Sequence, residues 1–222
     1  MVTDAKGVRP LFPGARLRRD EFLRRCEAMP EVKKAELIGE LVYMQGASSF
    51  STGKRMRTFV AGCTAIRCVY QGAKTWLMLE DAPQPDVHLL IRPDFGGQSY
   101  IRVDYHAGAP ELAAEVCLSR MDYDLHQKLA LYQSAGVQEY VTILLAEQEA
   151  RWHRLVRGNY ELMRPSPDGS LRSQVFPGLW LKPEALLTGN SAKVYETLQL
   201  GLQSAEHADF VRLLASRKQS SG

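Results

Sequence analysis

A strand–helix–strand pattern in the second half of the chain limits the possible folds most strongly. Residues 112–118 form an apolar run with strand character, residues 123–135 have helical spacing and end before Gly136, and residues 139–146 form a second apolar run. Two strands joined by such a helix are expected to lie parallel, with a right-handed crossover, in a sheet covered by helices. The pattern therefore predicts an α/β (α+β) layer around a mixed central sheet.

The other segments are expected to extend this sheet and cover it. The hydrophobic spacing predicts helices over residues 18–29 and 53–71, and a strand pair over 35–44 with a turn or bulge at Gly39. Further strands are expected at 76–79 and 87–91. A β-meander is expected at 150–156, 159–165 and 171–176, and a closing amphipathic helix at 191–216, with Val194, Leu198, Leu202, Ala205 and Leu213 near one stripe.

Composition excludes several classes of protein. The 222 residues predict a single domain over 1–222, with its core at about 18–190 and a C-terminal helix at about 191–216. A net charge of +3 permits a nucleic-acid partner without requiring one. The four cysteines show no CxxC spacing, so a reduced, cytoplasmic protein is expected. No signal peptide and no apolar run of membrane-spanning length is present, so no membrane contact is expected.

Two charged residues stand where apolar ones are expected. Glu115 is the one charged residue of the run 112–118, and a buried carboxylate must be paired, protonated or bound to a metal. On a helical wheel for 123–135, Lys128 falls in the middle of the apolar arc formed with Leu125, Leu129 and Tyr132. A partner Arg or Lys for Glu115, and a snorkelling Lys128 or one paired with Asp124, are the purely structural alternatives.

Two further carboxylates stand at the starts of strands. Asp86 follows Pro85 at the start of VHLLI, where an Asp is often a turn residue, and Glu36 begins the strand pair. An Asp at one strand end, a Glu inside the next strand and an inward lysine together form a divalent-metal site with a cation that orients water. Two carboxylates suit Mg²⁺, which keeps several of its waters.

The chain resembles the Uma-type restriction endonuclease family, a former domain of unknown function within the PD-(D/E)XK nuclease superfamily. The resemblance spans about residues 20–200 and is carried by PQPDVHLLI, GAPELAAEVCLSRMDYDLHQKLALYQSAGVQEY and VFPGLWLKPEALL, with AELIGELVYM upstream. It implies a restriction endonuclease-like fold: a mixed sheet flanked by helices.

The resemblance also implies site residues. Asp86 matches the Asp of the signature, and Glu115 matches its (D/E). Cys117 replaces the usual lysine, and Lys128 on the following helix stands where this family is thought to place it. Glu36 matches an acidic residue of the family's first hairpin that could complete the metal shell. Asp86, Glu115, Lys128 and Glu36 are thus the expected catalytic residues, with Asp86 and Glu115 as the metal ligands.

The expected function is Mg²⁺-dependent hydrolysis of DNA phosphodiester bonds, in which Mn²⁺ can substitute. Replacing Lys128 with Met is then expected to lower turnover while stability holds or rises. Gly39 and Glu40 stand where relatives often have Asp and Gly, and the helical His of many relatives is absent. Lys54, Arg55 and Arg57 are the expected substitutes at the nucleic acid.

A second hypothesis follows from these departures: an inactive nuclease-fold module that binds nucleic acid or a protein. By analogy with nucleases of this fold, a homodimer is expected, with the meander offering an apolar edge.

Overall fold

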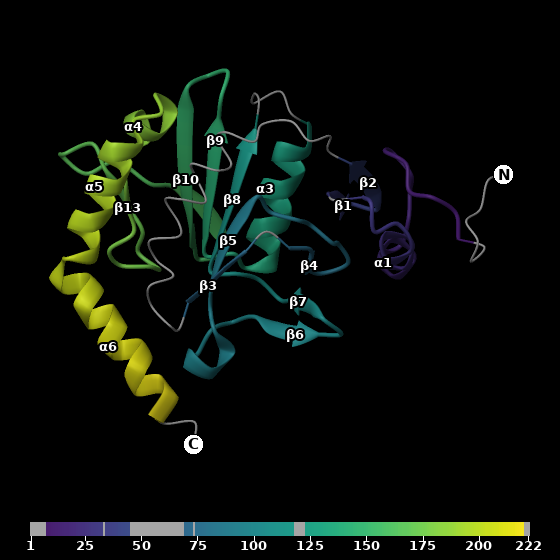
Figure 1. Cartoon of the computed structure of the whole chain (residues 1–222), viewed down its shortest axis with the longest axis horizontal. Coiled ribbons are helices and arrows are strands. Elements are labelled where there is room, and N and C mark those ends of the chain that lie inside the picture. The colour runs from purple at the N-terminus through teal and green to yellow at the C-terminus, as the bar shows by residue number, and fades with distance from the viewer. Residues whose placement is uncertain (1–7, 33, 45–68, 73, 118–122, 220–222) are drawn as a thin grey trace.

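The centre of the molecule is a six-stranded mixed sheet (Figure 1). The computed structural model describes residues 8–32, 34–44, 69–72, 74–117 and 123–219. The strand order is β11-β10-β9-β8-β5-β3. The strands are β3 (Val69–Gly72), β5 (Val87–Ile91), β8 (Leu112–Cys117), β9 (Glu139–Leu144), β10 (Glu149–Val156) and β11 (Asn159–Leu162).

The predicted strand–helix–strand unit is confirmed. Strands β8 and β9 pair in parallel, and α3 (Tyr123–Ala135) connects them. Gly136, at a φ of +86°, follows the helix in the left-handed conformation that glycine adopts most easily. The remaining pairs of the sheet are antiparallel, so the sheet is mixed as expected.

Each face of the sheet has its own hydrophobic core. Alternate strand residues point to opposite faces, so Leu89 and Leu112 belong to one core whereas Leu90 and Ala113 belong to the other. The first core is covered by the C-terminal elements β12 (Leu171–Arg172), β13 (Trp180–Leu181), α4 (Pro183–Leu187), α5 (Ser191–Leu202) and α6 (Ala205–Gln219). The second core is covered by α3 (Figure 1). The two covered faces explain why the central strands are apolar on both sides.

The N-terminal segment forms a small layer outside the sheet. It comprises α1 (Arg19–Ala28) and a hairpin of β1 (Ala35–Ile38) and β2 (Leu41–Met44), with a hydrophobic cluster of its own that includes Phe22, Leu37 and Val42. The hairpin lies beside α3 (Figure 1). The predictions of this helix and of the strand pair with its turn at Gly39 are confirmed.

Short elements that the sequence pattern did not distinguish complete the fold. Strands β4 (Trp76–Leu77), β7 (Tyr105–Ala107) and β6 (Tyr100–Arg102) form a three-stranded sheet in that order. The short 3₁₀ turn η2 (Pro93–Phe95) follows β5. The predicted strand at 76–79 therefore holds only for its first two residues.

The predicted helix at 53–71 is wrong at its end. Residues 53–68 lie outside the described part of the chain, but residues 69–71 are part of strand β3, which pairs with β5 through Val69 and Ile91. Pairing with a distant strand overrides the local helical spacing here.

The predicted meander ends after its second strand. Pro165 and Pro167 follow β11, and proline cannot donate a hydrogen bond to a continuing strand pair. Residues 171–172 instead pair with 180–181 in a separate two-stranded sheet.

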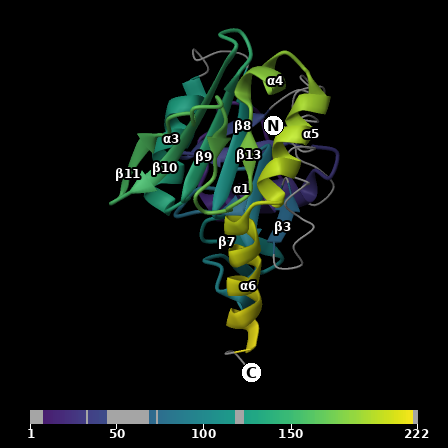
Figure 2. The same ribbon diagram turned by 90° about the vertical axis from the view of Figure 1, so that its left-hand side faces the viewer.

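The predicted closing helix is two helices. Gln203 and Ser204 separate α5 from α6, and the Ser204 hydroxyl accepts a hydrogen bond from the His207 N–H, as an N-terminal cap does. The break shifts the helical phase, so Leu213 is 49 % exposed, while Phe210 and Leu214 are buried. Figure 2 shows α6 extending away from the body of the molecule. No helix in the described ranges is long and apolar enough to cross a bilayer.

Candidate active site

Glu115 and Asp86 meet at one end of the paired strands β5 and β8. The register pairs Val87 with Ala114, and continuing it by one residue brings Asp86 opposite Glu115. The Val116 N–H donates a hydrogen bond of 2.9 Å to Asp86 Oδ2, which fixes this carboxylate against β8. Glu115 alternates with Ala114 along the strand, so its side chain faces α3 and is buried there.

Lys128 of α3 joins two carboxylates in the layer between helix, hairpin and sheet. Its Nζ lies 2.9 Å from Glu36 Oε2 and 3.1 Å from Glu115 Oε1. All three side chains are at most 3 % exposed. The prediction that Lys128 points inward is confirmed, and the snorkelling alternative is wrong.

Glu36 enters this group from strand β1. Its Oε1 accepts a hydrogen bond of 2.7 Å from the Gln84 N–H, in the loop that leads to β5. Its Oε2 is fully buried and is paired with the Lys128 ammonium, whose Nζ lies 2.9 Å away. The hairpin thus contributes a carboxylate that is held by a backbone N–H on one oxygen and by Lys128 on the other.

Lys34 is the residue of this cluster that the sequence analysis missed. Its Nζ lies 2.5 Å from Asp86 Oδ1, and the two side chains are 19 % and 25 % exposed. A signal was present, because Lys34 stands two residues before Glu36 and hence shares its face of an extended chain. The structure therefore brings together three carboxylates and two lysines.

Tyr132 supports the cluster from α3. It lies one helical turn after Lys128, is fully buried, and donates a hydrogen bond of 2.8 Å from its hydroxyl to Glu115 Oε1. The Tyr132 hydroxyl and the Lys128 ammonium group therefore both contact Glu115 Oε1. This arrangement holds the carboxylate in one orientation.

Burial and crowding of like charges dominate the electrostatics of the site. Burial raises the pKa of Glu115 to about 7; Lys128 opposes this shift, while the neighbouring Asp86 and Glu36 carboxylates add to it. Burial lowers the pKa of Lys34, but Glu115, Glu36 and Asp86 outweigh it, so the Lys34 pKa lies above its ordinary value. The cluster as a whole attracts cations.

The donor set suits a hard divalent cation with a partly retained water shell. Within the described ranges, no three His, Cys, Asp or Glu side chains are arranged to hold a metal ion by themselves. Asp86 and Glu115 nevertheless offer two carboxylates at adjoining strand ends, and Glu36 adds a third, buried carboxylate on the same lysine as Glu115. Mg²⁺ is commonly held by one or two carboxylates together with waters and phosphate oxygens. The residues present fit that pattern.

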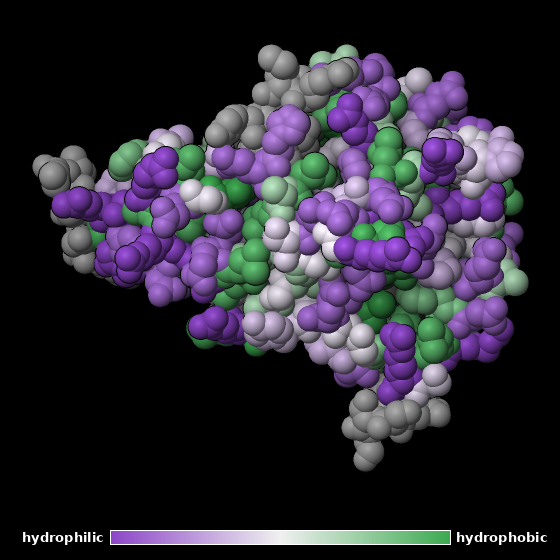
Figure 3. Space-filling model, turned by 180° about the vertical axis from the view of Figure 1, so that it is seen from behind, coloured by the Kyte–Doolittle hydropathy of each residue, from purple (hydrophilic) through white to green (hydrophobic). Residues whose placement is uncertain are grey.

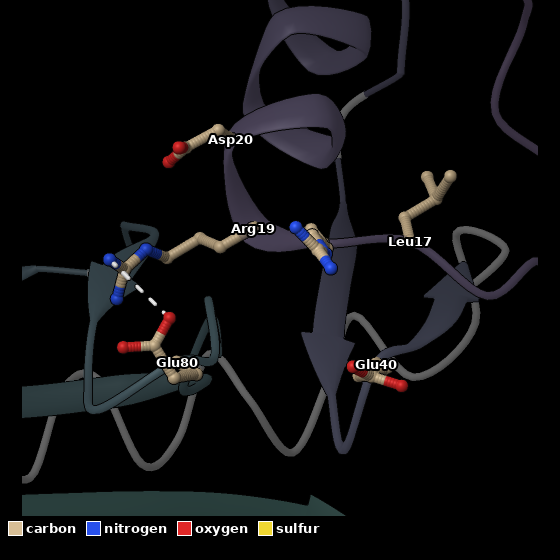
Figure 4. A pocket seen from close by; sticks show the side chains of 6 residues that line it. Leu17, Arg19, Asp20, Glu40 and Glu80 are labelled. Atoms are coloured by element: carbon tan, nitrogen blue, oxygen red, sulfur yellow. Dashed lines mark ion pairs between the residues drawn. The ribbon is translucent and has the colours of Figure 1, made fainter.

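The expected nucleic-acid contacts Lys54, Arg55 and Arg57 lie outside the described residues. A separate open pocket of about 360 Å³ lies beside Glu40, in the turn of the hairpin (Figure 4). Arg19 and Glu80 form an ion pair across it, and Glu40 and Asp20 line it as well. None of the cluster residues lines this pocket.

Comparison with solved structures first defines the class of fold. The chain is similar to the crystal structure of a putative nuclease belonging to DUF820 from Anabaena variabilis ATCC 29413, with a TM-score of 0.59 and 16 % sequence identity. The match covers 78 % of this chain and 98 % of that one. The mixed sheet with flanking helices is therefore the fold of that DUF820 protein, as the sequence predicted.

Comparison with protein families then identifies the family itself. Residues 19–184 match the family described as "Uma2: Putative restriction endonuclease", which is about three quarters of the chain. The chain belongs to this family, and the predicted resemblance is confirmed. No curated protein matches the chain significantly.

Proposed function

We propose that this protein is a Mg²⁺-dependent endonuclease that hydrolyses DNA phosphodiester bonds. The observation that supports this function best is the cluster in which Lys128 pairs with Glu36 and Glu115, while Asp86, next to Glu115 at the end of β5 and β8, pairs with Lys34. Buried carboxylates beside a buried lysine are costly to fold, and clusters with strongly shifted pKa values are typical of functional sites. Family membership supports the same chemistry.

Each residue has a role in this proposal. Asp86 and Glu115 hold Mg²⁺ or Mn²⁺, and Glu36 completes the shell directly or through water. When bound, such an ion lowers the pKa of a water molecule and stabilises negative charge on a phosphoryl oxygen. Lys128 keeps Glu36 and Glu115 in position, orients the attacking water and offsets charge on the phosphate. Tyr132 fixes the orientation of Glu115.

The proposed substrate is DNA, bound in part through its phosphates. Lys54, Arg55 and Arg57 are the proposed phosphate contacts, because guanidinium and ammonium groups neutralise backbone charge whatever the base sequence.

The test is cleavage of supercoiled and linear DNA by the purified protein with Mg²⁺ or Mn²⁺. The wild type should nick or cut DNA, and Glu115→Gln should lower the rate by at least about a hundredfold, the scale expected when one electrostatic stabiliser is lost. Glu111→Gln is a matched control, because Glu111 is also buried at β8 but accepts hydrogen bonds from the Ile91 and Gln98 N–H groups outside the cluster.

Absence of cleavage by correctly folded wild type, on every DNA and RNA form tried, would contradict the proposed activity. An inactive module that binds nucleic acid or a protein would then be the better description.

We also propose that the protein acts as a homodimer that pairs through the free edge of the sheet. Strand β11 is the terminal strand on that side (Figure 2), and its Leu162 is 58 % exposed. The face seen in Figure 3 carries hydrophobic side chains in small groups between hydrophilic ones, so this one face offers no broad apolar surface for pairing. Light scattering at micromolar concentration should give twice the mass of the chain. A salt-independent monomer mass would contradict this assembly.

A further inference from the structure

The two lysines of the site differ in their access to solvent. The Lys128, Glu36 and Glu115 side chains are at most 3 % exposed, whereas those of Lys34 and Asp86 are 19 % and 25 % exposed. The Lys34–Asp86 pair therefore forms the mouth of the cluster, and the other three side chains form its floor.

The contacts of Asp86 define where a second cation would have to bind. Its Oδ2 accepts the hydrogen bond from the Val116 N–H, and its Oδ1 is held by the Lys34 ammonium. A divalent ion on Oδ1 would approach a positive charge that already occupies that oxygen, so the two cations compete. A metal ion cannot displace the Lys128 ammonium group in the same way, because two buried carboxylates would then face each other.

We propose that Lys34 is the exchangeable cation of the site. A divalent ion displaces its ammonium group from Asp86 Oδ1, and the released ammonium then faces the phosphate of the bound nucleic acid. This inference deepens the proposed function and depends on it. The sequence alone would not distinguish the two lysines, because they differ in burial and not in charge.

The charge balance of the cluster favours such an exchange. With all groups ionised, three carboxylates and two ammonium groups leave one net negative charge. A divalent ion would reverse this to one net positive charge, and one phosphodiester would then neutralise it. The flexible four-carbon stem of Lys34 lets its charge move outward without disturbing β1.

Titration of the full chain with Mn²⁺ in a calorimeter tests the first half of the proposal. Lys34→Met should bind Mn²⁺ roughly tenfold more tightly than the wild type, because the fraction of molecules with Asp86 open to the metal rises. Lys34→Arg, which keeps the charge, should bind close to the wild type. Lys193→Met is the matched control: it makes the same charge change and breaks a 2.8 Å ion pair with Glu196 on α5, outside the cluster.

Duplex binding in Ca²⁺ tests the second half. Lys34→Met should bind DNA several-fold more weakly, and the slope of log affinity against log salt should fall by about one, as expected for the loss of one phosphate contact. Lys193→Met should leave both quantities unchanged.

The outcomes separate this inference from the function on which it depends. If the wild type binds Mn²⁺ and Asp86→Asn abolishes that binding, but Lys34→Met changes neither metal nor DNA affinity, the exchange is wrong and the metal site stands. If Asp86→Asn and Glu115→Gln bind Mn²⁺ like the wild type, the metal site and the exchange are both wrong.

Discussion

Two lysine side chains of the cluster differ in their burial and in their partners. Lys128 contacts Glu36 and Glu115 beneath α3, whereas Lys34 contacts Asp86 where solvent reaches the pair. A buried ammonium between two carboxylates has no lower-energy position to which it can move, since either departure uncovers a charge. The same charge at the mouth of the cluster loses little by moving into water.

Replacing Lys128 with Met should destabilise the protein. The variant would keep Glu36 and Glu115 as neighbouring buried acids without the ammonium group that offsets their charge, and removing one member of a buried ion pair costs about 3–5 kcal/mol. The free energy of unfolding, measured with urea, should fall on this scale. The sequence analysis predicted that stability holds or rises, on the ground that an apolar side chain replaces a desolvated cation; the close pairing of Lys128 with two buried carboxylates favours the opposite.

The double variant Glu36→Gln, Lys128→Met provides the control for this prediction. It removes one of the two repelling carboxylates, so it should recover part of the lost stability. A Lys128→Met protein as stable as the wild type would contradict the buried-pair interpretation.

At the scale of residues, a member of the cluster could be predicted from the sequence when its charge stood out from its neighbours. Glu115 and Lys128 were visible because each is a charge on an apolar face, and Asp86 and Glu36 were visible as carboxylates at strand starts, to which the resemblance to a family gave more weight. Lys34 was missed because it precedes a strand, between a second lysine and an alanine, where a charge is unremarkable. The hydrogen bond from Tyr132 to Glu115 depends on helix–sheet packing that no local pattern specifies.

At the scale of elements, the turn of the β1–β2 hairpin requires two residues with positive φ, and substitutions can test this requirement. Gly39 and Glu40 both have positive φ, at 57° and 63°, as the two central residues of a type I′ turn do. A Cβ on Gly39 would meet no atom within 4 Å, so only its backbone conformation restricts it. A left-handed conformation costs most L-residues about 1–2 kcal/mol, and Asn less.

Opposite effects are therefore expected from two substitutions in this turn. Gly39→Ala should lower the free energy of unfolding by about 1 kcal/mol, and Glu40→Asn should raise it by about 0.5 kcal/mol. Urea denaturation of both variants measures the effects. Equal shifts of the same sign would contradict the proposed turn geometry.

Elements with strong local signals were predicted well, and those defined by distant partners were not. The hairpin, β5 and α3 follow from short-range spacing and from turn residues. The strand at 69–72 and the small pair of β12 and β13 depend on pairing with segments farther along the chain. The break before α6 had a local signal in Ser204, a residue that favours helix starts.

At the scale of the whole molecule, buried carboxylates connect stability to pH. Glu111, Glu115 and Glu139 are all buried in or beside the central strands, and burial raises the pKa of each. Glu139 accepts hydrogen bonds from the Gln174 and Val175 N–H groups, which ties the segment before β13 to the sheet. The folded protein therefore binds more protons than the unfolded chain over part of the acid range.

The pH dependence of stability should differ between the wild type and Glu115→Gln. The folded-state pKa of Glu115, about 7, lies above the ordinary value of 4.5, so its protonated form favours the folded state. Its contribution is fully present below about pH 4.5 and is lost as the pH rises through 7. Between pH 5 and 8 the free energy of unfolding should therefore decline more steeply in the wild type than in the variant. Parallel curves from urea denaturation across this range would contradict the raised pKa.

The position of Glu36 outside the main sheet links folding of the N-terminal layer to the chemistry of the site. Its hairpin belongs to a separate hydrophobic cluster, and an opening of this layer with the six-stranded sheet still folded would also have to free Ile38 of β1 from the core beneath α3. Such an opening would withdraw Glu36 from Lys128 and leave Lys128 paired with Glu115 alone. By thermodynamic reciprocity, whatever binds the completed cluster also holds the hairpin closed. Ligand binding should thus increase the protection of the hairpin amides against hydrogen exchange, because both depend on the closed state of the hairpin.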